Sequence, residues 1–116
     1  MVIPNGVKKI DGSAFCNCGL TRIVIPDCVT SIGDWAFHWC GELEEVTIPE
    51  SVTSIGAGAF GYCSNLKSII IPNSVTYIGE SQFEECNSLE QITVEKNNSF
   101  YASVDGVLFN KSKTEL

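Results

Sequence analysis

Residues 49–67 read PESVTSIGAGAFGYCSNLK, and this stretch decides the fold because the chain repeats its pattern. Within it, a valine lies three residues after the proline, an isoleucine six, a phenylalanine eleven and a cysteine fourteen. An isoleucine precedes the proline, and the same order returns at spacings of 22, 23 and 23 residues: Pro4, Pro26, Pro49 and Pro72. Such a fixed internal period is the signature of a repeat architecture.

Each recurring position becomes a column of like residues if the copies stack on one another. The phenylalanine column is Phe15, Phe37, Phe60 and Phe83, and the cysteine column is Cys18, Cys40, Cys63 and Cys86. One unit of about 23 residues has too little core to be stable alone, so its apolar face must be covered by neighbouring units. The sequence therefore predicts a solenoid in which equivalent residues lie about 4.8 Å apart.

The local pattern within a repeat predicts one strand and one turn. The run Leu66 to Pro72 is a strand with Ile69 and Ile71 pointing inward, and the proline ends it because it cannot donate to the strand ladder. Phenylalanine and cysteine lie three residues apart in Glu80 to Cys86, which favours a short helical or 3₁₀ turn. The glycine before this segment, Gly79, is expected to let the backbone bend.

The recurring pattern IPxSVTxIGxxAFxxCxxLxx resembles the BspA-type leucine-rich repeat over residues 2 to about 95. The resemblance implies an α/β repeat solenoid, mostly β by residue count. It would be a right-handed, curved superhelix with a parallel sheet on the concave face and short helical turns opposite. The family is widespread in secreted and surface proteins of bacteria and some protozoa, and its better-known members act as adhesins. The chain is therefore expected to be a fragment of such a protein.

The repeats divide the chain into two parts. We expect four repeats of 22–23 residues over residues 1–95 and a capping segment over residues 96–116. In the tail, an Asp-Gly pair stands between apolar residues in Val104-Asp105-Gly106-Val107, which predicts a hairpin turn. Residues 110–113 form a second polar turn. A β element here would cover the end of the sheet and block the addition of further strands.

No comparable cap is visible at the N-terminal end. Val7, Ile10 and Phe15 are expected to lie there without a preceding repeat to cover them. Unpaired sheet edges recruit other strands, so the sequence predicts a weak homodimer through this end.

Composition and charge exclude several classes of protein. Seven basic against fourteen acidic residues give a net charge of −7, which argues against nucleic-acid binding. No apolar run approaches the roughly 20 residues needed to cross a bilayer, so membrane insertion is not expected. The first residues, MVIPNGVKKI, show no signal peptide. Through the resemblance, the expected location is nevertheless the cell surface or the extracellular space, as part of a longer protein.

The sequence predicts no enzyme and no cofactor. It contains a single histidine, His38, expected to face solvent without a nucleophile beside it, and no nucleophile elbow or phosphate-binding glycine loop. The cysteine column cannot hold zinc, because four sulfurs in a line do not meet at one point. Disulfides within it are not expected, since stacked Cβ atoms about 4.8 Å apart exceed the preferred distance. Cys16 and Cys28 lie off the column and are expected to be the accessible thiols.

Two groups of residues are candidates for binding. The first is an aromatic group, Trp35, Trp39 and Tyr62, in which Trp39 and Tyr62 share one column and should lie side by side. These rings could equally serve as ordinary covering over the turns. The second is the outward face of the predicted strands, which varies between repeats: Arg22, Glu45, Ser68 and Gln91 in one column, and Val24, Thr47, Ile70 and Thr93 in the next.

These candidates lead to two hypotheses of function. The first is a non-catalytic interaction module that binds protein or glycan partners, such as host surface or matrix proteins, through the strand face or the aromatic group. The second is a structural spacer whose repeats extend a stalk and bind no ligand. The variation on the strand face is compatible with both.

Overall fold

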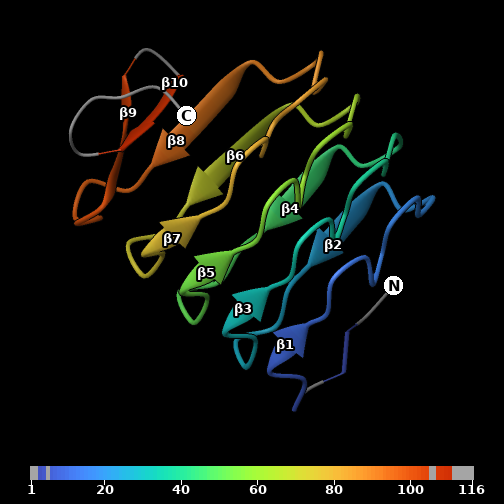
Figure 1. Ribbon diagram of the computed structural model, residues 1–116, viewed down its shortest axis with the longest axis horizontal. Helices are drawn as coiled ribbons and strands as arrows, with labels where there is room; N and C mark the ends of the chain where they lie inside the picture. The colour runs from blue at the N-terminus through green and yellow to red at the C-terminus, as the bar shows by residue number, and fades with distance from the viewer. Residues whose placement is uncertain (1–2, 5, 105–106, 111–116) are drawn as a thin grey trace.

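The computed structural model of the chain describes residues 3–4, 6–104 and 107–110. Strands stack in two parallel rows along the molecule (Figure 1). The first row is one four-stranded sheet of β1 (Lys9–Ile10), β3 (Ser31–Ile32), β5 (Ser54–Ile55) and β7 (Tyr77–Ile78). The second row contains β2 (Arg22–Val24), β4 (Glu45–Thr47), β6 (Ser68–Ile71) and β8 (Gln91–Val94). The chain is therefore a parallel-strand solenoid, as the repeat predicts.

The strand predicted between Leu66 and Pro72 is confirmed as β6, with Ile69 and Ile71 buried. The first row of strands is an addition that the sequence analysis missed. Each of its strands has only two residues, so it carries no alternation of apolar and polar side chains to recognise. Handedness and curvature stay predictions.

The predicted helical turns are wrong: no helix occurs among the residues that the structure describes. The segment between Gly33 and Cys40 shows the reason. The amides of Ala36, His38 and Cys40 each bond to the carbonyl three residues back, but the amides between them donate to the next repeat. Phe37, for example, donates to the Ala59 carbonyl at 2.8 Å. Residues with positive φ interrupt any helical run in these segments, so the result is a chain of turns.

The phenylalanine column forms the centre of the core. The rings of Phe15 and Phe37 stack with centroids 5.3 Å apart, and those of Phe37 and Phe60 with centroids 5.4 Å apart. Phe37 and Phe60 have no exposed surface, whereas Phe15 and Phe83 at the two ends of the column are half-buried. Each inner ring is thus covered by its neighbours, as a repeat architecture requires.

The recurring polar residues connect each repeat to the one before it. The Ser51 hydroxyl donates to the Val29 carbonyl at 2.6 Å, and the Cys63 thiol donates to the Phe37 carbonyl at 3.2 Å. Equivalent bonds are made by Ser74, Cys40 and Cys86 in other repeats, and Thr53 and Thr76 form a third column of the same kind. Serine, threonine and cysteine therefore recur at these positions because their side chains satisfy carbonyl groups of the preceding repeat.

The glycines of the repeat are explained by close approach rather than by the bend expected at Gly79. Gly33, Gly56 and Gly79 do not have positive φ. A Cβ atom on Gly33 would lie 2.5 Å from the backbone nitrogen of Gly12, and the other two would meet the preceding backbone just as closely. Only a residue without a side chain allows two repeats to stack at this point.

The C-terminal end of the solenoid is closed by two polar side chains. Buried Asn98 donates from Nδ2 to the carbonyls of Pro72 and Val75, at 2.9 and 3.0 Å, while its Oδ1 accepts the amides of Phe100 and Tyr101. The Tyr101 hydroxyl accepts the Ile78 amide at 2.8 Å. These bonds complete the last repeat, and the sequence analysis did not identify either residue in this role.

Beyond this closure, β9 (Tyr101–Val104) and β10 (Val107–Asn110) pair antiparallel, with Val104 opposite Val107. This pairing agrees with the predicted Asp-Gly hairpin, although Asp105 and Gly106 themselves lie outside the described residues. Residues 111–113 of the second predicted turn also lie outside them. The division of the chain at residue 95 stays a prediction.

At the N-terminal end lies a hollow of about 270 Å³, whose lining includes the apolar Ile3, Val7, Ile10 and Phe15 and the charged Lys9 and Asp11. Ile10 is buried, contrary to the expectation that it lacks a cover, because Ile3 packs in the same cluster. Val7 and Phe15 are half-buried. The homodimer through this end stays a prediction.

Candidate interaction surfaces

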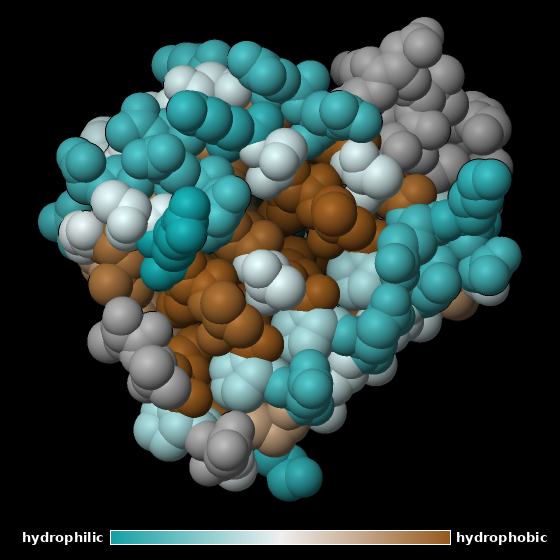
Figure 2. Space-filling model, turned by 180° about the vertical axis from the view of Figure 1, so that it is seen from behind, coloured by the Kyte–Doolittle hydropathy of each residue, from teal (hydrophilic) through white to brown (hydrophobic). Residues whose placement is uncertain are grey.

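The eight predicted strand-face residues all lie on the second row of strands. The register pairs Arg22 with Glu45 and Ser68 with Gln91. Apart from half-buried Thr93, their side chains are exposed, including the apolar Val24 at 66% and Ile70 at 59%. On the side of the molecule opposite to that in Figure 1, a band of hydrophobic surface runs between hydrophilic margins (Figure 2).

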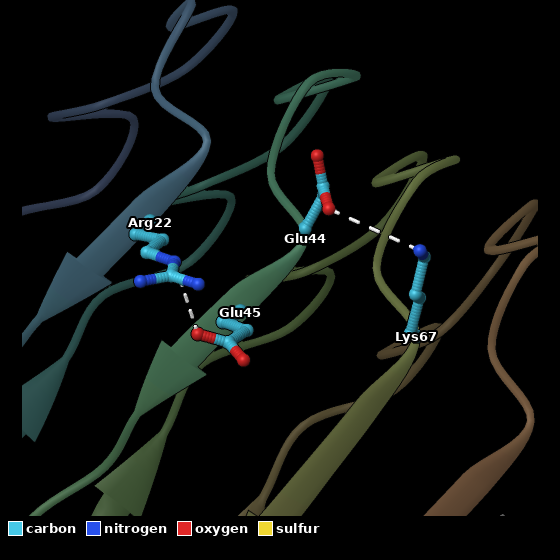
Figure 3. Close-up of polar contacts among 4 residues, drawn as sticks. All are labelled: Arg22, Glu44, Glu45 and Lys67. Atoms are coloured by element: carbon cyan, nitrogen blue, oxygen red, sulfur yellow. Dashed lines mark ion pairs between the residues drawn. The ribbon is translucent and has the colours of Figure 1, made fainter.

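Two ion pairs cross between neighbouring repeats on this row. Arg22 Nε lies 3.2 Å from Glu45 Oε2, and Lys67 Nζ lies 3.9 Å from Glu44 Oε1 (Figure 3). All four side chains are about half or more exposed, so water screens both pairs. These contacts contribute little to stability, and the side chains stay accessible to a partner.

The strand row is divided in the middle, which the sequence did not predict. β2 pairs with β4 and β6 with β8, but β4 and β6 do not pair as strands. A groove of about 300 Å³ lies between these two strands, lined by side chains that include Glu45, Thr47, Ser68 and Ile70. The predicted columns are therefore present as two pairs of strands rather than as one continuous sheet.

The aromatic group lies on the turn segments and forms one ring cluster. The rings of Trp39 and Tyr62 stack with centroids 4.8 Å apart and planes 15° apart, so the predicted neighbourhood is confirmed. His38 joins them, with its ring edge-on to Trp35 at 5.0 Å and to Tyr62 at 5.3 Å. The expectation that His38 faces solvent is wrong: it is half-buried because three aromatic rings surround it.

All three aromatic residues adopt backbone conformations that bulky side chains rarely take. Trp35, Trp39 and Tyr62 have φ values of 58°, 63° and 58°, in the left-handed region. The equivalent positions in other repeats hold residues that tolerate this region better. Asn17 in the first repeat is equivalent to Trp39, and Gly58 in the third repeat is equivalent to Trp35. The solenoid thus requires a left-handed backbone at these columns, and the two middle repeats place aromatic rings there despite a cost of about 1–2 kcal/mol per residue.

Beside the stacked rings runs a groove with a volume of about 460 Å³. Trp39 and Tyr62 lie along it, and Gly19, Gly41 and Ser64 leave it open. The remaining lining consists of Cys18 and of the polar or acidic residues Asn17, Glu42, Glu85 and Asn87, so that the whole lining draws on all four repeats. Sequence reasoning found the rings but missed the groove, because small residues at a turn carry no periodic signal.

The groove is electrically negative. The charge of Glu84, then burial, then the charge of Glu85 raise the pKa of the Tyr62 phenol above its ordinary value. Neither of the two ion pairs described above involves Glu42 or Glu85. Among the described residues, no lysine or arginine lines this groove.

The column cysteines behave as packing residues. All six described cysteines are free, as expected for the column. Burial raises the pKa of Cys63 to about 12, and burial followed by the hydrogen bond with Cys18 raises the pKa of Cys40 as well. The sulfur atoms of Cys18 and Cys40 approach to 2.7 Å, much closer than the Cβ spacing expected of the stack. Cys16 is exposed as predicted, whereas Cys28 is half-buried.

The described part of the chain offers neither a metal centre nor a membrane span. No group of three or more histidine, cysteine, aspartate or glutamate side chains is placed to hold a metal ion there. Nor does that part contain a helix with the length and apolar character needed to cross a membrane.

Comparison with known protein families shows to which family the chain belongs. The family model for the BspA type leucine-rich repeat region, in six copies, matches residues 1–114. The chain belongs to the BspA-type leucine-rich repeat family. Among curated proteins, none matches the sequence.

Solved structures of bacterial proteins agree with this family. The crystal structure of the pneumococcal vaccine antigen PcpA is 36% identical, covers 90% of this chain and 26% of its own, and has a TM-score of 0.87. A leucine-rich repeat protein from Bacteroides ovatus is 39% identical over 86% of this chain and 26% of its own, with a TM-score of 0.77. A third, from Eubacterium ventriosum, is 31% identical over 93% of this chain and 35% of its own, with a TM-score of 0.71. The chain thus spans about a quarter to a third of these relatives.

Proposed function

We propose that the chain is a non-catalytic interaction module of a cell-surface or secreted repeat protein, which binds a protein or glycan partner. The observation that carries this proposal is the stacked pair Trp39 and Tyr62 beside the groove of about 460 Å³. Trp39 is 54% exposed, although its left-handed backbone would be easier to form with asparagine. Exposed, rigid aromatic side chains of this kind dominate many binding surfaces.

Two further features support the proposal. The strand-face residues offer a second exposed surface with both apolar and charged side chains, centred on Val24, Ile70 and the Arg22–Glu45 pair. A non-catalytic role fits His38, whose described ring contacts are with aromatic side chains. Placement at the cell surface is supported by the similarity to a pneumococcal vaccine antigen.

A spacer role is the alternative, and the regular bonds between repeats favour it. Each repeat is attached to the next through backbone amides and through side chains such as Ser51, Thr53 and Cys63. Such a ladder is what a stiff, extended spacer needs, because each repeat contacts only its neighbours.

The two functions are separated by substitutions taken from the chain's own columns. Trp39→Asn installs the residue found at Asn17, so the backbone is kept while the ring is lost. As a control, Tyr77→Ser removes an exposed aromatic ring from the first strand row and installs the residue found at Ser31 and Ser54. Both variants and the unaltered chain are screened against glycan and matrix-protein arrays. Binding that Trp39→Asn abolishes and Tyr77→Ser leaves intact supports the module; the absence of any bound partner supports the spacer.

A further inference from the structure

The groove beside Trp39 and Tyr62 combines two features that select a class of ligand. It presents aromatic rings, and it presents carboxylates that no described ion pair neutralises. Resting on the proposed function, we propose that this groove binds a basic peptide segment, whose arginine or lysine side chains lie against the ring pair of Trp39 and Tyr62 and beside the carboxylates of Glu42 and Glu85.

The ring geometry leaves one face of the Trp39 indole without a stacked ring from a neighbouring repeat. Tyr62 covers one face of Trp39, and the column neighbour on the other side is Asn17, which carries no ring. The opposite face of the Trp39 indole is therefore not stacked on an aromatic partner from the preceding repeat. A guanidinium or ammonium group over an indole face gains about 0.5–2 kcal/mol, more than over any other side chain.

The charges favour a cation over a neutral ligand. Glu42 and Glu85 both line the groove, and Glu84 lies close enough to Tyr62 to affect the ionisation of its phenol. Arginine can bond to a carboxylate through two parallel N–H groups, which adds geometric specificity. A neutral sugar would stack on the rings equally well but would leave these charges uncompensated.

The groove is long enough for a peptide rather than a single side chain. Its lining comes from all four repeats, from Asn17 to Asn87. Three inter-repeat spacings of about 4.8 Å correspond to about 14 Å, the length of roughly four extended residues. The amide side chains of Asn17 and Asn87 stand at the two ends, where each can both donate to and accept from a peptide group.

The test uses a fluorescently labelled, terminally blocked peptide, Gly-Arg-Gly-Arg-Gly, and follows its anisotropy as the chain is added. Matched probes are Gly-Glu-Gly-Glu-Gly and a labelled neutral tetrasaccharide, cellotetraose. Only the arginine peptide is expected to bind. Raising NaCl to about 1 M should weaken this binding, because the Debye length falls to about 3 Å and the charges are screened.

Variants of the groove then locate the bound peptide. Trp39→Asn is expected to lower the affinity for the arginine peptide by about five- to tenfold, and the double variant Glu42→Gln/Glu85→Gln to lower it by about two- to fivefold. Tyr77→Ser should change nothing. Circular dichroism and thermal unfolding verify that each variant is folded.

The other outcomes are equally informative. Arginine-peptide binding that is insensitive to Trp39→Asn, or no binding at all, overturns the proposal. Binding of cellotetraose that depends on Trp39, without binding of the peptide, overturns the cationic ligand but leaves the proposed interaction module standing. If the array screen finds partners that bind without Trp39, the groove itself is wrong as the binding site.

Discussion

Two columns of the turn segments lie only two residues apart in each repeat and differ in every other respect. The phenylalanine column holds the same residue four times; the first three rings stack on one another, and Phe83 packs against the same core. The column beside it holds Asn17, Trp39, Tyr62 and Glu85, four different residues with nearly the same φ, between 56° and 63°. Where the space is shared between repeats, the side chain is fixed; where only the backbone shape is required, the side chain is free to carry function.

The phenylalanine column should show the largest effect of any substitution. Phe60→Ala leaves a cavity between Phe37 and Phe83 and is expected to lower the free energy of unfolding by about 3–5 kcal/mol. Chemical denaturation measures this directly. A loss below about 1 kcal/mol would mean that the column does not support the core.

A single added methyl group should test how tightly the repeats approach each other. Gly56→Ala places a Cβ against the backbone of Gly33 and Asp34 and is expected to cost about 1–3 kcal/mol through overpacking. Ala57→Gly at the next, half-buried position serves as a control for the change in glycine content. Equal stability of Gly56→Ala and the unaltered chain would contradict the close approach.

Alkaline pH should have a smaller effect, through the buried thiols. The pKa of Cys63 is about 12 in the folded chain, against 9.0 for an unperturbed thiol, because burial disfavours the thiolate. Between these values the folded state holds a proton that the unfolded state has lost, so this contribution to stability is complete below pH 9 and falls as the pH rises. Thermal unfolding of the unaltered chain and Cys63→Ala is compared from pH 8 to pH 11. Cys63→Ala should lose less stability over this range, whereas Cys16→Ala at an exposed thiol should match the unaltered chain.

The smallest effect on stability is expected in the turn column. Trp39→Asn loses the stacking on Tyr62, worth about 0.5–1.5 kcal/mol, but relieves a left-handed tryptophan at a cost of similar size. The free energy of unfolding should therefore change by less than about 1 kcal/mol. A loss of several kcal/mol would place Trp39 among the residues that hold the fold and would remove the contrast between the two columns.

Much of the fold could be predicted because its determinants recur. Ile69, Phe60 and Cys63 occupy positions whose burial or bonding repeats every 22–23 residues, and a period of that kind is visible in a single sequence. The helical turns were predicted wrongly because phenylalanine and cysteine three residues apart also suit a chain of turns. Their amides alternate between local bonds and bonds to the next repeat, which only the stacked structure shows.

The candidate site was predictable in part for the same reason. The column argument placed Trp39 beside Tyr62, since equivalent positions of adjacent repeats must be neighbours. It could not show that His38 lies among the rings, that β4 and β6 are unpaired, or that a groove follows the turns. The column argument also could not identify Asn98 and Tyr101, because a residue that closes the last repeat has no counterpart in the other repeats.

The central claim is that the turn column binds while the core column holds the fold, and the two tryptophans allow a direct measurement. Trp35 and Trp39 are the only tryptophans in the chain, so a ¹H–¹⁵N spectrum contains two indole signals, which Trp39→Asn assigns. Titration with Gly-Arg-Gly-Arg-Gly should shift the Trp39 indole signal progressively and the Trp35 signal less, while signals of the buried core stay in place. A titration in which the Trp39 indole does not move, or in which core signals move as much as it does, would contradict the account.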